Sequence, residues 1–386
     1  MYARGPGIRI LRRGVAAALL CCCGSVPGCS ALYYRHQIKV AMFRPREAGR
    51  CRLDVRGRVP ILHLRGTPEE MGRQYGTLMK PALRALSAYA KAILSPGKQA
   101  QFLRYARAHE RYLPQEIRTQ LRATAAEAGV EYLELVALNV VPRLRCTTLA
   151  VWGPATADGE LLMGRNGDYF GLGLEDRGSL VVVYHPADGQ AMALVSFLGM
   201  AGGFAGINAR GVAFGNMLVF NAPGSRADGM PVQLAMRLAA AGSRSAHEMV
   251  QQLVAMKHAI PNNVMVADAT GAFVAELGAN GAHVRRGADG VLAAANDFRE
   301  HPARIDPGRC ARYDTLVHAA AGSRGPVTVE RMKKALFSAR MLTLNIQATV
   351  FEPAAMRMHV SINRKPAAAG PYETFDVHAL LEERDR

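Results

Sequence analysis

The chain has 386 residues, of which 49% are hydrophobic and 20% charged, a globular composition with enough length for a large core. Its formal net charge is +17, but the arginines are scattered and no basic run alternates with aromatic residues, which argues against a nucleic-acid partner. The sequence also lacks a Walker A motif, a phosphate-binding G-x-G-x-x-G, an H-E-x-x-H motif and zinc-like Cys/His spacing, so we expect no metal or organic cofactor.

The N-terminal residues 1–29 have the pattern of an export signal. Basic residues without acids precede an apolar run at 14–23, and Val26-Pro27-Gly28-Cys29 resembles a lipoprotein box. The apolar run is too short to cross a membrane as a mature helix. We therefore predict a periplasmic protein, with Cys29 as the candidate for a lipid that tethers it to the outer membrane. An uncleaved N-terminal anchor is the alternative.

The predicted elements before Cys146 are mainly helical. Residues 30–59 have mixed charge and little periodicity, so we expect a linker, followed by a short strand at 61–64. Thr67-Pro68-Glu69-Glu70 has the pattern of a capping box with proline in the first turn, and begins a helix. Further helices are expected at 89–94, 102–112, 117–128 and 132–139. Residues 60–145 form the predicted helical part.

The character of the chain changes at Cys146, where a β-rich part (146–386) begins. Strands are predicted at 147–152, 160–168, 180–185, 191–198, 204–220, 263–268, 272–277, 281–295, 346–352 and 357–362. Helices are predicted at 231–241, 246–256, 310–321 and 329–341. This alternation indicates an α+β fold in which sheets are stacked between helical layers.

Cys146 opens a predicted hairpin that turns at Asp158-Gly159 and returns to Gly164-Arg165-Asn166-Gly167-Asp168. A cysteine there can serve as a nucleophile. If the peptide bond before Cys146 were cut, the residue would have both a thiol and a free α-amine of pKa ~7.7–8.0, which suits a general base. A buried structural cysteine is the alternative. Cys51 and Cys310, the other cysteines outside the leader, could form a disulfide in an oxidising compartment.

Several segments together resemble the C45-type N-terminal-nucleophile hydrolases, the family of acyl-CoA:6-aminopenicillanic acid acyltransferase. More distantly, the chain is similar to penicillin V acylase, bile-salt hydrolase and the acid-ceramidase group. The matching segments are Arg65 to Gly76, Cys146-Thr147-Thr148, Gly164 to Asp168, Gly206-Ile207-Asn208 with Gly211 and Asn216, Asn263 with Ala267-Asp268 and Gly271, and Tyr372 with Phe375-Asp376.

The resemblance implies a four-layer αββα sandwich and a precursor that cuts itself before Cys146. The helical fragment would end at Arg145 and stay associated with the β-rich fragment. The implied activity is hydrolysis of linear, non-peptide amides, or acyl transfer, through a Cys146 thioester, on a small-molecule amide or acyl donor. The alternatives are a non-catalytic envelope lipoprotein on a degenerate hydrolase fold, and an uncut cysteine hydrolase that uses a histidine.

The resemblance also implies roles for particular residues. Asp168 would hold the new α-amine, and Arg165 would offset its effect and favour the thiolate. Asn263 aligns with the family's oxyanion-hole asparagine. Because strand alternation lets only one of two neighbours point into the site, we choose Asn263 over Asn262 from its spacing to Asp268. Asn216 is a second candidate donor.

Three further residues are candidates for contact with the substrate or the new amine. Thr148 could donate to the amine or simply favour a strand. Arg309 and Arg312 lie at the start of the predicted helix 310–321, where the family often has an arginine near the substrate or the carboxylate. A solvated helix surface is the alternative for both arginines.

Overall fold

The computed structural model describes residues 27–140, 145–169, 171–306, 308–321 and 325–382. Two sheets form its centre. The larger has ten strands in the order β1-β2-β3-β6-β7-β8-β9-β10-β11-β12, and the smaller has six, β13-β4-β5-β14-β15-β16. Their bounds are β1 Arg46–Ala48, β2 Cys51–Arg56, β3 Val59–Gly66, β4 Arg145–Val151, β5 Leu162–Asp168, β6 Ser179–Pro186, β7 Met192–Phe197, β8 Ala205–Asn208, β9 Ala213–Leu218, β10 Asn262–Asp268, β11 Gly271–Gly278, β12 Gly281–Arg286, β13 Val291–Ala294, β14 Asn345–Glu352, β15 Arg357–Ile362 and β16 Glu373–Asp376.

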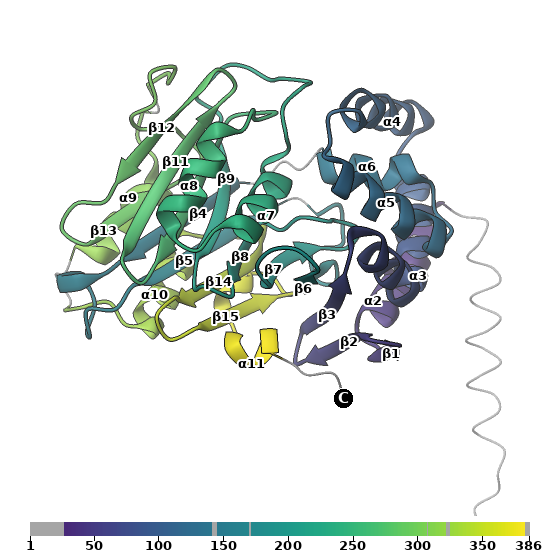
Figure 1. The fold of residues 1–386 in the computed structure, drawn as a ribbon, viewed down its shortest axis with the longest axis horizontal. Helices are drawn as coiled ribbons and strands as arrows, with labels where there is room; N and C mark the ends of the chain where they lie inside the picture. Colours follow the sequence, from purple (N-terminus) through teal and green to yellow (C-terminus); the bar gives the residue numbers. More distant parts are fainter. Residues whose placement is uncertain (1–26, 141–144, 170, 307, 322–324, 383–386) are drawn as a thin grey trace, which may run out of the picture.

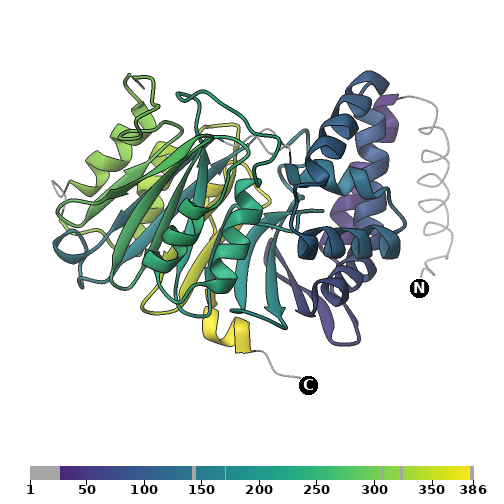
Figure 2. The same cartoon turned by 45° about the horizontal axis from the view of Figure 1, so that its top comes forward.

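The two sheets pack face to face and helices cover their outer faces (Figures 1 and 2). Strand β4 contacts β9, and β11 contacts β13, across the interface between the sheets. Helices α7 (Val232–Gly242) and α8 (Ala246–Ala255) lie on the larger sheet, while α9 (Ala311–Ala320) and α10 (Val329–Ala339) lie on the smaller one. The last helix, α11 (Val377–Glu382), follows β16. The predicted four-layer αββα arrangement is therefore confirmed.

The remaining helices gather at one end of the larger sheet (Figure 2). They are α2 (Pro27–Met42), α3 (Pro68–Ile93), α4 (Pro96–Glu110), α5 (Gln115–Ala128) and α6 (Tyr132–Val140). The predicted capping box at Thr67 and Glu70 begins α3. A Cβ on Gly72 would lie 2.4 Å from the Gln120 carbonyl oxygen, so glycine is what lets α3 and α5 approach so closely.

The helical part and the β-rich part share the larger sheet. Strand β3 pairs in parallel with β6, from Ile61 opposite Val181 to Gly66 opposite Pro186. A parallel pair needs a long crossover, and here the crossover contains α3 to α6 and the β4–β5 hairpin. The Arg145–Cys146 bond thus lies within a connection whose two ends are fixed side by side.

The prediction of a linker over residues 30–59 is wrong. This range holds most of α2, then β1, β2 and the start of β3. Helix α2 buries Ile38, Ala41 and Met42, while β2 buries Cys51 and Leu53. The buried residues are too few and too widely spaced among charged ones to give a periodic signal, and only packing against α3 and β3 orders them.

Two other predictions concern the leader and the cysteines. Residues 1–26 of the predicted leader lie outside the described residues, and in the part of the chain that is described no helix combines the length and apolar character needed to span a membrane. The disulfide between Cys51 and Cys310 is not formed, since both are free thiols. The buried Cys51 thiol instead donates to the Ala48 carbonyl.

Candidate active site

Cys146 points into the interface between the two sheets. Strand β4 alternates, so Leu149 and Val151 join the core beneath α9 and α10, whereas Cys146 and Ala150 belong to the core that includes the larger sheet. The thiol is fully buried. Burial raises the pKa of the Cys146 thiol above its usual value, because desolvation disfavours the thiolate.

Arg165 supplies the compensating charge. It sits on β5, and its guanidinium donates to the Cys146 sulfur at 3.0 Å. The same side chain donates to the backbone carbonyl of Asn216 at 3.0 Å and to its side-chain oxygen at 3.3 Å. Arg165 is 1% exposed, and the nearby cation opposes the effect of burial on the thiol pKa. The pair therefore places a buried cation against the thiol, while burial still keeps the pKa of the Cys146 thiol above its usual value.

Asp168 lies at the end of β5, beside the Arg145–Cys146 peptide bond. It stands opposite Arg145 in the β4–β5 register, and Gly167 stands opposite Cys146. Its carboxylate accepts from Asn345 Nδ2 at 2.8 Å and from Arg312 at 3.3 Å. Burial raises the pKa of Asp168 to about 6, with Asn345 and Arg312 acting in the opposite direction. Near neutral pH the carboxylate is therefore largely ionised and able to hold a cation.

Asn296 holds the nitrogen of Cys146. Strand β13 pairs with β4 as far as Ala294 opposite Thr148, and the same register continued would place Asn296 opposite Cys146. The backbone has left the ladder there, and the Asn296 side-chain oxygen accepts from the Cys146 N–H at 3.0 Å. Arg312 donates to that oxygen at 2.7 Å and to the Cys146 carbonyl at 3.3 Å. The peptide nitrogen of Cys146 is thus fixed by a side chain.

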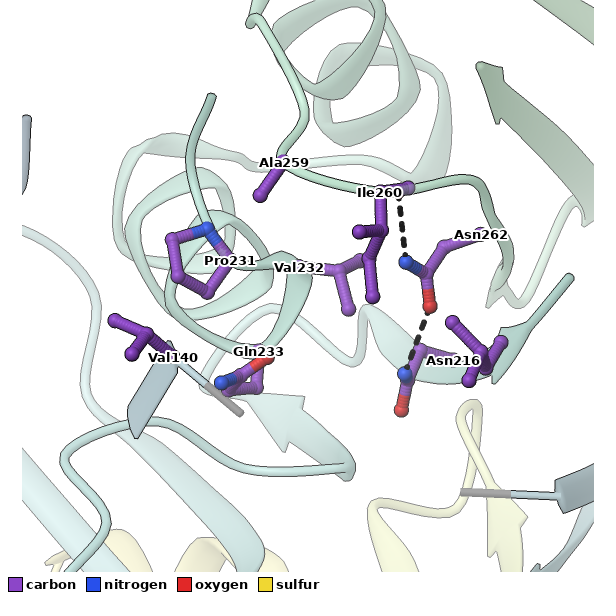
Figure 3. A pocket seen from close by; sticks show the side chains of 9 residues that line it. Val140, Asn216, Pro231, Val232, Gln233, Ala259, Ile260 and Asn262 are labelled. Carbon is purple, nitrogen blue, oxygen red and sulfur yellow. Dashed lines mark hydrogen bonds between the residues drawn. The ribbon is translucent and has the colours of Figure 1, made fainter. Parts of the chain in front are cut away.

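A small pocket that opens to solvent lies beside this cluster, with Asn216 in its wall (Figure 3). Its lining is mostly apolar, with three amide side chains, and consists of Val140, Asn216, Leu218, Pro231, Val232, Gln233, Ala259, Ile260 and Asn262. Asn216 donates to the Asn262 side-chain oxygen at 3.2 Å, and Asn262 donates to the Ile260 carbonyl at 3.0 Å. Asn216 connects this pocket to the thiol, because Arg165 donates hydrogen bonds both to Asn216 and to the Cys146 sulfur.

The choice of Asn263 over Asn262 is contradicted by the structure. Asn262 lines the pocket, whereas the Asn263 amide nitrogen donates to the Ala295 carbonyl at 3.0 Å and the Asp297 carbonyl at 2.8 Å. Both of its donors are used by this loop, so neither is available for an oxyanion. Strand β10 is buried on both faces, so its sequence gives no indication of which neighbour faces the pocket.

The structure gives the other two candidates different surroundings. Thr148 lies two residues after Cys146 on the same face of β4, and its hydroxyl contacts the Met217 sulfur at 3.4 Å. The Arg309 side chain is 92% exposed and pairs with Asp314 at 3.2 Å. It therefore lies on a solvated helix surface, which was the alternative to a contact with the substrate. Arg312 is brought into the carboxylate network instead, because it lies on α9 where that helix contacts β4.

Asn296 and Asn345 are the site residues that sequence reasoning missed. Asn296 directly follows the predicted strand that ends at 295, so a polar residue at a strand end was the available signal. Asn345 opens β14, where it is opposite Asp168. Among the described residues, no group of three or more His, Cys, Asp and Glu side chains is arranged to hold a metal ion.

The chain matches the family model described as acyl-coenzyme A:6-aminopenicillanic acid acyl-transferase over residues 155–356, just over half of its length. The match includes Arg165, Asp168, Asn296 and Arg312, and begins after Cys146.

Curated relatives match a shorter part of the chain. Protein dcd1B of Dictyostelium discoideum is 28% identical over 218 residues, which are 48% of this chain and 43% of that protein. An uncharacterized protein of Archaeoglobus fulgidus is 26% identical over 212 residues, 44% of this chain and 35% of that protein. The chain therefore spans less than half of the length of these relatives.

Solved structures also resemble the chain. One is an N-acylethanolamine-hydrolyzing acid amidase ortholog of Caenorhabditis elegans, with TM-score 0.44 and 18% identity over 54% of this chain and 93% of that one. Another is a mutant of conjugated bile acid hydrolase from Clostridium perfringens, with TM-score 0.42 and 14% identity over 60% and 96%. A third is penicillin V acylase from Agrobacterium tumefaciens, with TM-score 0.39 and 12% identity over 56% and 83%.

Proposed function

Because the chain belongs to the acyl-coenzyme A:6-aminopenicillanic acid acyltransferase family, as its motifs predicted, we propose that it is a self-cleaving cysteine hydrolase or acyltransferase. Its substrates would be linear, non-peptide amides or acyl donors. The observation that carries the proposal is the contact of 3.0 Å between the Arg165 guanidinium and the Cys146 sulfur. The residue before Cys146, Arg145, lies opposite Asp168 on the neighbouring strand. Cys146 is the proposed nucleophile in both self-cleavage and turnover.

Self-cleavage would begin with the Cys146 thiolate. It attacks the carbonyl carbon of Arg145, the C–N bond between these residues breaks, and the proton lost by the thiol ends on the Cys146 nitrogen. Arg145 is then held as a thioester on the same sulfur. Water hydrolyses the thioester, which leaves a carboxylate on Arg145 and a free amine and thiol on Cys146.

Turnover would use the new amine as the acid and base. The thiolate attacks the substrate carbonyl, the Cys146 ammonium protonates the leaving amine, and an acyl thioester remains. The neutral amine then takes a proton from water, or from an acceptor amine, as that group attacks the thioester. Asp168 supports this role because an ionised carboxylate next to the amine favours its protonated form, while Arg165 and Arg312 limit that effect.

The pocket supports a substrate with an apolar acyl group. Asn262 and Asn216 lie on its wall and have amide groups of the kind that stabilise a developing oxyanion, so they replace Asn263 as the proposed donors. Pro231, Val232 and Ile260 would contact the acyl chain. Val140 comes from the helical fragment, so the pocket would need both fragments.

Continued association of the fragments is supported by the larger sheet. Residues 61–66 of the helical part pair with residues 181–186 of the β-rich part, and Asn139 of the helical part accepts and donates hydrogen bonds with Ala201 and Gly199. Cutting one bond in the crossover would leave these contacts in place.

Export remains part of the proposal. We propose that the leader directs the chain to the periplasm and that Cys29 bears the tether to the outer membrane. Cys29 lies at the start of α2, well before the residues of that helix that are buried against α3, which supports its availability for a lipid. Mass analysis of the N-terminal peptide of the purified protein would detect a diacylglycerol on Cys29, and a free or absent cysteine would contradict the tether.

Intact-mass analysis of the purified protein tests the main proposal. We expect two fragments that meet at the Arg145–Cys146 bond, and one unbroken chain for Cys146→Ala. Incubation with N-acyl amides of different chain length should then show amine release by the cleaved protein alone. A single unbroken chain that is active would favour an uncut cysteine hydrolase, and an unbroken inactive chain would favour the non-catalytic lipoprotein.

A further inference from the structure

A buried polar pair lies behind the segment that bears Asn296. Asn263 on β10 and Glu276 on β11 are directly opposite each other in the register of the larger sheet. Both are 0% exposed. Directly paired residues project on the same side of a sheet, and both contact the loop that follows β13.

Asn263 holds the two peptide groups that flank Asn296. Its amide nitrogen donates to the carbonyl of Ala295 at 3.0 Å and to that of Asp297 at 2.8 Å. Its side-chain oxygen is buried and has no hydrogen-bond partner among the described residues. An apolar side chain would avoid this unsatisfied oxygen, so the value of asparagine here lies in its two donors.

Glu276 holds the next part of the same segment. Its carboxylate accepts from the backbone N–H groups of Arg299 at 2.8 Å, Glu300 at 3.0 Å and His301 at 2.6 Å. Arg285 balances the charge, with its Nε 2.7 Å from the Glu276 carboxylate, and also donates to the Ala293 carbonyl on β13. The pair, with Arg285, therefore makes hydrogen bonds to the backbone on both sides of Asn296.

We propose that Asn263 and Glu276 are positioning residues that aim the Asn296 side chain at the nitrogen of Cys146. The inference rests on the proposed function, since it makes the polar pair necessary for self-cleavage. The backbone of Asn296 is no longer paired with β4, so the strand pairing does not fix the direction of its side chain. Other contacts to the backbone around Asn296 must do so. The two residues touch neither the sulfur nor the pocket, and act through Asn296.

Asn263→Ala tests the proposal, and Asn208→Ala is the matched control. Asn208 is also 0% exposed, and its amide nitrogen also donates to two backbone carbonyls, those of Ala240 and Ser243. We expect both variants to lose thermal stability, but only Asn263→Ala to slow the appearance of the two fragments, by at least tenfold. Glu276→Gln keeps the shape but not the full acceptor set, and should slow cleavage in the same direction if Asn263→Ala does not fold.

A second measurement does not depend on cleavage. In the Cys146→Ala chain, which stays intact, the amide of residue 146 should be protected by Asn296. Residue-resolved hydrogen exchange should then show exchange at residue 146 at least tenfold faster after Asn263→Ala or Glu276→Gln than after Asn208→Ala.

The outcomes separate the two proposals. Equal exchange at residue 146 in all these variants, or equal slowing of cleavage by Asn263→Ala and Asn208→Ala, would overturn the positioning role. A wild-type chain that never cleaves would overturn the proposed function, while the exchange measurement would still decide whether the pair positions Asn296.

Discussion

The side-chain oxygen of Asn296 stands 3.0 Å from the backbone nitrogen of Cys146, at the register position where β13 no longer accompanies β4. A side-chain amide can accept from either form of the nitrogen. The relationship thus suits both the uncut and the cut state.

Loss of the Arg165 cation should raise the pKa of the Cys146 thiol further. We expect Arg165→Met to shift the midpoint of thiolate formation upward, because a cation within hydrogen-bonding distance favours the charged form. Ultraviolet absorbance of the thiolate, taken as the difference from Cys146→Ala, measures this midpoint. An unchanged midpoint would mean that Arg165 does not activate the thiol.

Asp168 should make turnover fall in acid. Burial raises the pKa of its carboxyl to about 6 in the uncut chain, and the new Cys146 ammonium beside it would lower that pKa. A protonated Asp168 can no longer hold the amine, so we expect the rate of amine release to fall as pH drops below about 6, and Asp168→Asn to have a low rate without this dependence. The same shift lowers stability as pH rises through about 6, because the folded state binds the proton more tightly than the unfolded chain does.

That stability effect provides an independent check. Thermal unfolding of the uncut Cys146→Ala chain should show the loss between about pH 4 and pH 6, where the folded and unfolded forms differ in protonation of Asp168. Adding Asp168→Asn to that chain should remove this component.

Arg312 and Arg309 offer a matched pair close together in sequence. Arg312→Ala removes the contacts to Asp168, Asn296 and the Cys146 carbonyl, so we expect the rate of self-cleavage to fall by at least tenfold. Arg309→Ala removes a solvent-exposed ion pair and should leave the rate within about twofold of the wild type. A time course of fragment formation by mass spectrometry compares them. Equal effects would show that position on the helix surface, and not contact with the site, matters.

Substitution of Asn262, which lines the pocket, should lower turnover. We expect Asn262→Ala to lower kcat by about 10²–10³-fold, the usual cost of losing one oxyanion donor, with a smaller change in KM. Steady-state hydrolysis of an N-acyl amide by the cleaved protein measures both constants. If kcat is unchanged while KM rises, Asn262 binds the acyl chain and does not stabilise an oxyanion.

The crossing of α3 and α5 should depend on glycine. Gly72→Ala would bring a Cβ to 2.4 Å from the Gln120 carbonyl oxygen, so we expect it to lower the free energy of unfolding by about 1–3 kcal/mol. Gly97 in α4 has open space around its position, and Gly97→Ala should be neutral or stabilising by up to about 1 kcal/mol. Chemical denaturation compares the two, and a destabilising Gly97→Ala would contradict the steric explanation.

Local parts of the fold could be predicted because their signals are local. Thr67 and Glu70 form the predicted capping box at the start of α3, and most strands and helices after Cys146 lie within a few residues of their expected bounds. The exceptions are the predicted strand 281–295, which is divided into β12 and β13 of different sheets, and β16 and α11, which were not predicted. Strands β4 and β5 are also neighbours in the chain and pair as the predicted hairpin. Cys146, Arg165 and Asp168 were therefore brought together as their spacing suggested.

Partners from distant strands could not be predicted in this way. Asn262 and Asn263 lie on a strand buried on both faces, so hydrophobic alternation carried no information about which one reaches the pocket. Helix α2 and strands β1 and β2 gave little periodic signal and became ordered through contacts with α3 and β3.

The sequence alone determined most of the elements from residue 61 to residue 362, the hairpin that carries the nucleophile and the family to which the chain belongs. The tertiary structure alone decided that Asn296 meets Cys146 across 150 residues, that Arg312 faces the carboxylate while Arg309 faces solvent, and that Asn263 points at a loop. The physical reason is the range of the interactions: turns, caps and hairpin registers depend on neighbours in the chain, whereas the face that a buried polar side chain presents depends on how whole sheets pack.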